Sequence, residues 1–261
     1  MKKYLVIGNP IEHSLSPKLH NHWIQQNNID AVYEKKQLNE SDIEAMIDEI
    51  KSEKINGINV TIPFKKSVIP FLDQLTLIAK EAQSVNTIFK KNHKIVGDNT
   101  DIGGFEYGLK HINYDVQNKK VFILGAGGVV PSIILALKKL GVFKISLSNR
   151  TKEKAVELKK IYKDLEVINW GECIDFDMII NATSLGLKND DRIELDFGKI
   201  KSDKLFYDII YNPSKTNFLL KGEELGNKIE NGKMMFIYQA QLSFKIWHNI
   251  LPKVVDDKLL D

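Results

Sequence analysis

The sequence predicts an α/β protein of two domains, and three observations support this prediction. Strand-like apolar runs alternate with helix-like segments along the chain, which is typical of parallel sheets with crossover helices. The length of 261 residues is more often that of two domains than of one. The rhythm of the composition also changes after residue 101, where longer apolar runs begin.

Composition and charge argue against several classes of protein. The chain has 37 Lys and Arg residues against 34 Asp and Glu residues, and the two signs are interspersed along it. This argues against nucleic acid as a partner, because nucleic-acid binders usually concentrate basic residues on one face. The single cysteine, Cys173, excludes an intramolecular disulfide and a multi-cysteine metal site. The N-terminal apolar run breaks at Gly8-Asn9-Pro10, too early for a signal peptide, and no run could span a membrane, so we expect a cytoplasmic protein.

The elements of the first half follow from apolar periodicity and helix-start signals. Ser16 is expected to cap a helix that has Pro17 at its first position, and Asn39 or Ser41 to open a second helix. Pro63 ends the third strand. We expect strands at 2–8, 31–38 and 57–63, helices at 16–27, 39–55 and 66–84, and a hairpin at 85–101.

The second half begins with an apolar strand, a glycine turn and an apolar helix within residues 119–141. Boundaries near Asp101 and Gly232 divide the chain into a first domain (1–101), a second domain (102–232) and a C-terminal segment (233–261). We expect the helix of that last segment to pack back on the first domain. Further strands are expected at 144–151, 165–170, 177–184 and 204–211, and the longest helix at 232–251.

The glycine turn "LGAGGVV", residues 124–130, is a candidate dinucleotide-binding motif. Gly125 and Gly127 match the first two glycines of that fingerprint, where the backbone turns tightly and approaches a pyrophosphate at a helix N-terminus. Val130 stands at the third position, so the fingerprint is incomplete.

The end of the following strand favours NADP over NAD. An NAD site has an acidic side chain about 20 residues after the glycines, where it holds the ribose hydroxyls. This chain instead has Asn149, Arg150 and Thr151 there, with Lys154 one helical turn later. Two cations and two neutral hydrogen-bonding groups suit a 2′-phosphate, so we expect NADP as the cofactor.

Polar side chains interrupt apolar strands in the first half. Asn59 and Thr61 alternate in "NVTIPFKKS", and Asn86 stands in the apolar setting of "SVNT". Polar groups on a buried strand cost free energy unless they find partners, so these residues are candidates for a site.

A lysine and an aspartate accompany these polar residues. Lys65 follows Pro63, and Asp101 lies in "GDNTD" at the domain boundary. Opposite charges at a cleft mouth hold each other in place and can act as a proton-transfer pair. The alternatives are that Lys65 and Lys66 form a solvated pair and that Asp101 caps a helix.

The stretch "GNPIEHSLSPKLHNHW", residues 8–23, follows the first strand, where α/β proteins place binding loops. His13, His20 and His22 are candidate metal ligands, and Gly8 is a candidate phosphate contact. His20 and His22 are two residues apart on the expected helix and do not share a face, which argues against a metal site.

Taken together, the motifs resemble the shikimate dehydrogenase family in order and spacing. They are "SLSP", "NVTIPFK", "SVNT", "GDNTD", "GAGG", "NRT", "NATSLG", "YDIIYNP" and "GKMMFIYQA", and they extend from Gly8 to about Trp247. The resemblance implies reversible reduction of 3-dehydroshikimate to shikimate with NADPH, in aromatic amino-acid biosynthesis. It implies an N-terminal α/β substrate domain, a Rossmann-like NADP-binding domain and no metal.

The resemblance also implies roles for individual residues. Lys65 and Asp101 would be the catalytic pair, in which Lys65 donates to the carbonyl oxygen and Asp101 orients Lys65. Ser14 and Ser16 would bind the substrate carboxylate. The other implied substrate contacts are Asn59, Thr61, Asn86, Tyr211 and Gln239. The implied cofactor contacts are Gly125, Ala126, Gly127 and Gly128 at the pyrophosphate, Asn149, Arg150, Thr151 and Lys154 at the adenosine phosphate, and Thr183, Ile209 and Gly232 at the nicotinamide.

Two alternatives stay open. A quinate/shikimate dehydrogenase that uses NAD would tend to have an acidic residue where this chain has Arg150-Thr151. A shikimate-sensing protein without activity would have a substituted Lys65 or Asp101, and both are present. We expect a small-molecule substrate, neither nucleic acid nor membrane as a partner, and leave a homodimer open.

Overall fold

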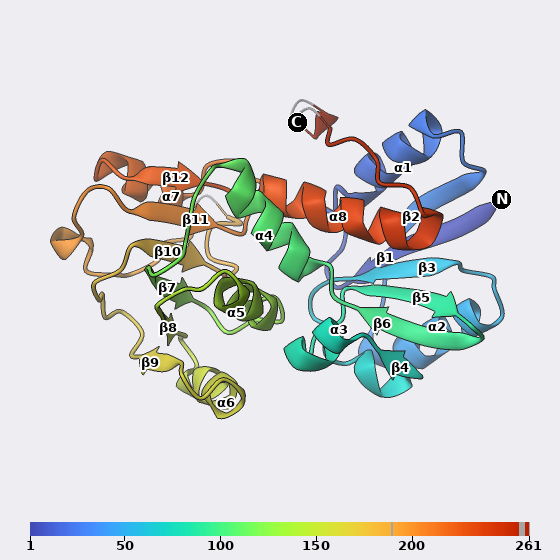
Figure 1. The fold of residues 1–261 in the computed structure, drawn as a ribbon, viewed down its shortest axis with the longest axis horizontal. Helices are drawn as coiled ribbons and strands as arrows, with labels where there is room; N and C mark the ends of the chain where they lie inside the picture. Colours follow the sequence, from blue (N-terminus) through green and yellow to red (C-terminus); the bar gives the residue numbers. More distant parts are fainter. Residues whose placement is uncertain (189, 256–258, 261) are drawn as a thin grey trace. The chain divides into compact units, whose positions relative to one another are not determined.

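A computed structural model describes residues 1–188, 190–255 and 259–260, and Figure 1 shows its ribbon. The chain forms two compact units. Unit 1 comprises Met1–Gly104 and Ile237–Asp261, and unit 2 comprises Phe105–Phe236.

The chain passes from one unit to the other inside two helices. The first crossing follows Gly104 in α4 (Asp101–His111), and the second follows Phe236 in α8 (Lys233–His248). The sequence placed these crossings at Asp101 and Gly232, close to the starts of the same helices. Most of α8 therefore belongs to unit 1.

Unit 1 contains a mixed sheet in the order β2-β1-β3-β5-β6-β4. Strand β1 pairs in parallel with β2 and β3, whereas β5 pairs antiparallel with β3 and β6. The β5–β6 hairpin and the first three predicted strands are thereby confirmed, although β3 ends at Val60, before Thr61. The strands are β1 (Lys2–Gly8), β2 (Ala31–Gln37), β3 (Gly57–Val60), β4 (Gln74–Leu75), β5 (Thr87–Lys91) and β6 (Lys94–Asp98).

Helices cover both faces of this sheet. On one face, α2 (Ile43–Lys51) contributes Met46, Ile47 and Ile50 to a core that also contains Ile58 and Ile88 from the strands. On the other face, α1 (Ser16–Gln26) and α8 meet through their aromatic rings.

One helix start differs from the prediction and one agrees with it. Leu15 is the N-cap of α1 and Ser16 is its first helical residue, and the N–H of Ser16 donates to Ser14 Oγ. Asn39 does open the second helical segment. Its N–H donates to Asp42 Oδ2 at 2.8 Å, and a 3₁₀ turn (Glu40–Asp42) precedes α2.

The predicted helix at 66–84 is largely wrong. The segment contains a 3₁₀ turn (Ile69–Phe71), the short β4 and only six helical residues in α3 (Leu77–Ala82). Pro70 opposes a continuous helix, and Leu72 and Leu75 pack instead against the unit 1 core. Helix α3 begins only after Thr76, whose side chain accepts a hydrogen bond from the N–H of Ala79.

Unit 2 contains a parallel sheet in the order β12-β11-β10-β7-β8-β9. The four strands predicted after the glycine turn are confirmed, whereas β12 was not predicted. The strands are β7 (Lys120–Leu124), β8 (Lys144–Ser148), β9 (Glu166–Ile168), β10 (Met178–Asn181), β11 (Leu205–Asp208) and β12 (Lys228–Glu230).

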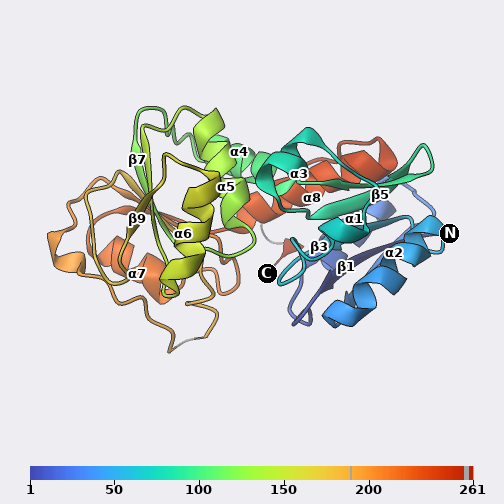
Figure 2. The same cartoon turned by 90° about the horizontal axis from the view of Figure 1, so that it is seen from below.

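The chain order reverses beside β7 in this sheet, with β8 and β9 on one side and β10 to β12 on the other. Because parallel crossovers are right-handed, the reversal places α5 (Val130–Lys139) and α6 (Lys152–Ile161) on one face and α7 (Asn217–Glu224) on the opposite face (Figure 2). The crevice at such a reversal is where doubly wound sheets bind ligands. The glycine turn follows β7 directly, so it lies at that crevice.

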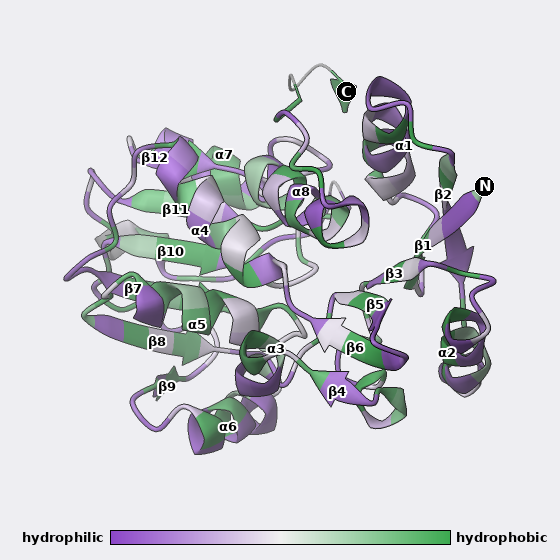
Figure 3. Cartoon of the chain, turned by 45° about the vertical axis from the view of Figure 1, so that its right-hand side comes forward, coloured by the Kyte–Doolittle hydropathy of each residue, from purple (hydrophilic) through white to green (hydrophobic). Residues whose placement is uncertain are grey.

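Figure 3 shows that β10 and β11 are hydrophobic over most of their length, as expected of strands covered on both faces. No helix in the described ranges is both long enough and apolar enough to cross a membrane.

Candidate active site

Lys65 and Asp101 form a buried ion pair in unit 1. The two atoms Lys65 Nζ and Asp101 Oδ2 are 2.6 Å apart, and the side chains are only 11% and 6% exposed. A solvated Lys65–Lys66 pair is therefore wrong, because only Lys66 is exposed. Asp101 is not the helix cap either, since the side chain of Asn99 accepts the N–H of Asp101 at 3.1 Å.

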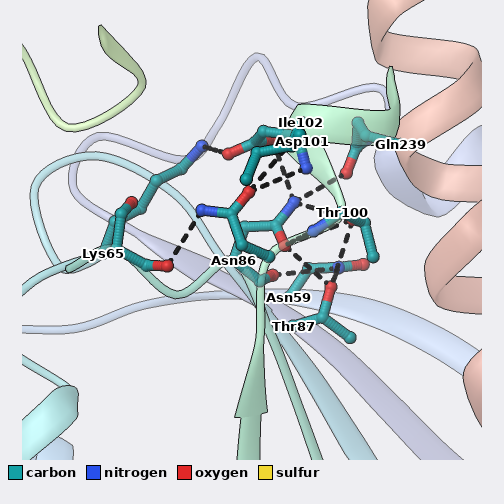
Figure 4. A network of polar contacts seen from close by, with 10 residues as sticks. Asn59, Lys65, Asn86, Thr87, Thr100, Asp101, Ile102 and Gln239 are labelled. Atoms are coloured by element: carbon teal, nitrogen blue, oxygen red, sulfur yellow. Dashed lines mark hydrogen bonds and ion pairs between the residues drawn. The ribbon is translucent and has the colours of Figure 1, made fainter. Parts of the chain in front are cut away.

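Asn86 holds the aspartate of this pair from the other side (Figure 4). Its Nδ2 donates to Asp101 Oδ1 at 2.9 Å, to Thr100 Oγ1 at 2.8 Å and to Gln239 Oε1 at 3.3 Å. Its Oδ1 accepts the N–H of Thr100 at 2.7 Å. The side-chain amide therefore links β5, the start of α4 and helix α8 around the ion pair.

Asn59 extends the same network along the sheet. It stands opposite Thr87 in the β3–β5 ladder. Its Nδ2 donates to Asn86 O at 3.1 Å and to Thr87 Oγ1 at 3.2 Å, while its Oδ1 accepts the hydroxyl of Tyr33 at 2.7 Å. These contacts offset the desolvation cost of polar groups on a buried strand, which was the expectation from "NVTIPFKKS".

Thr61 lies beside the carboxyl end of β1, where the loop that contains Ser14 begins. The N–H of Thr61 donates to Ile7 O at 2.9 Å, and a Cβ added at Gly8 would lie 2.6 Å from Thr61 Cγ2. In the loop itself, Ser14 Oγ accepts the N–H of Ser16 at 3.3 Å. Two hydroxyls at the start of α1 are suitable donors for an anion.

These side chains give unit 1 a definite chemical character. Amides and hydroxyls can hold the hydroxyl groups of a small polar ligand, and a lysine held beside a carboxylate can donate a proton to a carbonyl oxygen. A buried ion pair contributes little net stability because of its desolvation cost, so its presence at this position favours a functional role.

Gly125 and Gly127 in unit 2 differ in which atoms an added side chain would meet. Gly125 has φ +112°, and a Cβ there would lie 2.6 Å from Ala182 O, so the fold itself requires glycine. At Gly127 the nearest atom to an added Cβ is Ala182 O, at 3.9 Å. The protein leaves that space open, which fits a pyrophosphate approaching the backbone.

The candidate adenosine-phosphate residues follow directly on this turn. The backbone carbonyl of Ser148, the last residue of β8, accepts the N–H of Gly125 at 2.7 Å, and Arg150 stands two positions later. Arg150 and Lys154 are exposed, and within the described part of the chain neither side chain has a hydrogen-bond or ion-pair partner. Two cations without partners fit a phosphate group, so this donor set is compatible with NADP.

The candidate nicotinamide residues lie together at the ends of β10 and β11. Asn181 Oδ1 accepts the hydroxyl of Thr183 at 2.7 Å, and Asn181 O accepts the N–H of Ile209 at 3.0 Å. Gly232 is in contact with Ile209, because an added Cβ would clash with the Ile209 carbonyl.

Asp208 supports this arrangement and was missed by the sequence reasoning. Its carboxylate accepts Thr216 Oγ1 at 2.6 Å, the N–H of Ile210 at 3.0 Å and Asn181 Nδ2 at 3.1 Å. Burial raises the pKa of Asp208 to about 6, although these hydrogen bonds act to lower it. The available signal was a polar residue ending an apolar strand, as in "MIIN" and "LFYD".

Of the remaining candidates, Tyr211 belongs to unit 2, where its ring stacks on Phe236 with centroids 4.6 Å apart. His13 is exposed, His22 is half-buried and His20 is buried. Across the ranges that the structure describes, no three His, Cys, Asp or Glu side chains gather as a possible metal site.

Comparisons with known proteins identify the relatives of the chain. The family model "Shikimate dehydrogenase substrate binding domain" matches residues 6–88, and "Shikimate / quinate 5-dehydrogenase" matches residues 108–209. The shikimate dehydrogenase (NADP(+)) of Pelagibacter ubique (strain HTCC1062) is 60% identical over 253 residues, which is 97% of this chain and 96% of that relative.

Solved structures agree with this result. A shikimate dehydrogenase in complex with NADP⁺ has a TM-score of 0.91 at 32% identity, covering 100% of this chain and 93% of that chain. The shikimate 5-dehydrogenase of Thermus thermophilus, in complex with NADP(H) and shikimate, has a TM-score of 0.90 at 26% identity, covering 100% and 97%.

Proposed function

The chain belongs to the shikimate dehydrogenase family, and we propose that its net reaction is the reduction of 3-dehydroshikimate to shikimate by NADPH. The curated relatives are named shikimate dehydrogenase (NADP(+)), which supports NADP as the cofactor and the interconversion of these two compounds. The direction, the roles of individual residues and the division of labour between the units are our proposal. The observation that carries it is the buried Lys65–Asp101 pair inside a network of amides and hydroxyls.

The chemistry assigned to Lys65 is proton donation. Lys65 Nζ donates a hydrogen bond to the carbonyl oxygen of the substrate and stabilises the negative charge that develops there, then passes its proton to that oxygen. Asp101 Oδ2 holds Nζ in place during this step, and Asn86 holds Asp101 Oδ1. In the opposite direction the neutral Lys65 amine takes the hydroxyl proton back.

The other residues of unit 1 bind and orient the substrate. Ser14 and Ser16 bind its carboxylate at the start of α1. Asn59, Thr61, Asn86 and Gln239 bind its ring hydroxyls. Because the amides are held by one another, they need little reorganisation when the substrate binds.

Unit 2 binds the cofactor in this proposal. NADPH supplies the hydride when it is bound. The backbone of residues 125–128 would hold the pyrophosphate, for which the open space at Gly127 leaves room. Asn149, Arg150, Thr151 and Lys154 hold the 2′-phosphate, and Thr183, Ile209 and Gly232 border the nicotinamide.

We propose that the enzyme acts in the cytoplasm on a small molecule, with a homodimer as the candidate assembly. Analytical ultracentrifugation of the purified chain tests the assembly, and a single sedimenting species of 29.8 kDa would contradict a dimer.

The experiment that tests the function offers four substrate pairs and follows the absorbance of the reduced nicotinamide. Shikimate and quinate are each supplied with NADP⁺ and with NAD⁺. Turnover of shikimate with NADP⁺ well above the other three pairs is the expected result. Equal or faster turnover with NAD⁺ or quinate would favour the broader quinate/shikimate relative. No turnover with any pair, together with shikimate binding by calorimetry, would favour a sensing protein.

A further inference from the structure

Tyr33 lies beside the candidate substrate site and contacts one of its asparagines. It stands in the middle of β2 and is 1% exposed. Its hydroxyl donates to Asn59 Oδ1 at 2.7 Å. One buried phenol therefore holds the side-chain oxygen of the asparagine assigned to a ring hydroxyl.

Two neighbouring residues of α1 fix Tyr33 in place. The side chain of Asn21 binds the Tyr33 backbone at both ends, accepting its N–H at 2.9 Å and donating to its carbonyl at 2.7 Å. The ring of His20 stacks on the phenol ring, with centroids 4.1 Å apart and planes inclined by 3°. The "LHNHW" stretch thus holds Tyr33 in two ways, by aromatic stacking on its ring and by hydrogen bonds to its backbone.

The hydrogen bonds around Asn59 fix the orientation of its side-chain amide, and the Tyr33 hydroxyl is one of them. Asn86 O can only accept, so it requires the amide nitrogen of Asn59 on its side. Asn59 Nδ2 uses both of its hydrogens, on Asn86 O and Thr87 Oγ1. Asn59 Oδ1 accepts the Tyr33 hydroxyl and keeps one further lone pair, which can accept a substrate hydroxyl but cannot serve a carbonyl.

We propose that Tyr33 is a positioning residue of the substrate site, which holds the Asn59 amide so that its oxygen accepts a hydroxyl of the substrate. This inference rests on the proposed function, because it takes Asn59 to be a substrate contact. Tyr33 itself does not touch the substrate in this scheme. It acts on binding rather than on the proton transfer, which belongs to Lys65.

The test is the variant Tyr33→Phe, which keeps the ring on His20 and removes only the hydroxyl. Losing one buried hydrogen bond should raise the KM for shikimate about tenfold. Because the lost contact binds the substrate equally in the ground state and in the transition state, kcat should stay within about twofold of the wild type. The KM for NADP⁺ should not change. A KM for shikimate equal to that of the wild type would overturn the inference.

Tyr207→Phe is the matched control. Tyr207 is also fully buried, in unit 2, but its hydroxyl has no hydrogen-bond partner in the described part of the chain. Removing that hydroxyl should leave the KM for shikimate unchanged. An equal rise in KM in both variants would show that loss of any buried phenol has this effect, and would contradict a specific role for Tyr33.

A double-mutant cycle shows whether Tyr33 acts through Asn59. In an Asn59→Ala background, Tyr33→Phe should change the affinity for shikimate by less than about twofold, because the group that it positions is gone. A full tenfold effect in that background would overturn the inference. If Asn59→Ala alone left the affinity for shikimate unchanged, the proposed substrate site would fail instead, so the two failures are distinguishable.

Discussion

In unit 1 the ion pair and the asparagines around it are buried and hydrogen-bonded to one another, whereas in unit 2 the cofactor candidates include backbone groups and exposed cations. Asp101 has Lys65 on one oxygen and Asn86 on the other, while Arg150 and Lys154 have no side-chain partner in the described ranges. A paired network is ordered before the ligand binds, so removing one member should lower both the activity and the stability of the protein. Removing an exposed side chain without a partner should lower only the affinity for the ligand.

The largest expected effect comes from removing one charge of the paired network. Lys65→Ala should lower kcat by roughly 10³-fold, since general acid–base catalysis contributes about 10²–10⁴-fold. Shikimate binding should stay measurable by calorimetry. The buried Asp101 loses its counter-ion, so the free energy of unfolding should also fall by about 3 kcal/mol.

Lys66→Ala is the control for that variant, because Lys66 is the exposed neighbour of Lys65. It should resemble the wild type in turnover and in thermal stability. Wild-type turnover in Lys65→Ala would show that the assigned proton donor is wrong.

Substituting the two glycines of the turn one at a time distinguishes a glycine that folding requires from a glycine that cofactor binding requires. Gly125→Ala forces a side chain into a left-handed backbone and against Ala182 O, so it should cost about 3 kcal/mol of unfolding free energy. Gly127→Ala meets open space, so its unfolding free energy should stay within about 0.5 kcal/mol of the wild type, with weaker NADPH binding. Denaturant unfolding and cofactor titration measure the two effects. Equal destabilisation by both substitutions would remove the argument for a cradle at Gly127.

Removing an unpaired cation should affect only the cofactor. Arg150→Ala should raise the Kd for NADPH about 30-fold, the value of one charge-assisted hydrogen bond of about 2 kcal/mol. Binding of NADH, which lacks the 2′-phosphate, and the melting temperature should not change. Lys160→Ala, at the other end of α6, is the matched control. If Arg150→Ala weakened NADPH and NADH equally, the phosphate assignment would be wrong.

The smallest effect, when expressed per unit of pH, concerns His20, whose ring stacks on Tyr33. Burial, and secondarily the charge of His248, lower the pKa of His20 from 6.5 to about 3. Below pH 6.5 the unfolded chain therefore binds a proton that the folded chain excludes. Stability should fall by about 1.4 kcal/mol per pH unit from this residue as the pH drops from 6.5 toward 3.

Urea unfolding between pH 6.5 and 4.5 measures that slope. His20→Leu should make it shallower by the stated amount, whatever its effect on stability at neutral pH, whereas His13→Leu should not, because His13 is exposed. His248, whose pKa is lowered to about 4 by burial and by Lys2, contributes to the slope that remains. An unchanged slope in His20→Leu would show that His20 takes up its proton in the folded state.

The predictions from local patterns were confirmed where the pattern directly reflects backbone geometry. The turn around Gly125 was predicted from its glycines after an apolar strand, and the structure gives Gly125 a left-handed backbone that only glycine adopts without strain. The β5–β6 hairpin was predicted from a pair of strand-like runs that ends in a polar turn. The segment at 66–84 failed because its apolar residues pack irregularly around Pro70 against a core that no local pattern describes.

The sequence by itself determined the α/β class, the family and the preference for NADP. Each of these depends on residue types at fixed spacings along the chain, such as Arg150 where an NAD site has an acid. Only the tertiary structure decided which polar side chains meet. The 2.6 Å contact between Lys65 and Asp101, and the connection from His20 through Tyr33 to Asn59, join residues from different elements. Opposite charge and the family resemblance suggested the pairing of Lys65 with Asp101, and the structure supplies its distance. Nothing in the sequence suggested the connection through Tyr33, because hydrogen bonds between elements depend on packing in three dimensions.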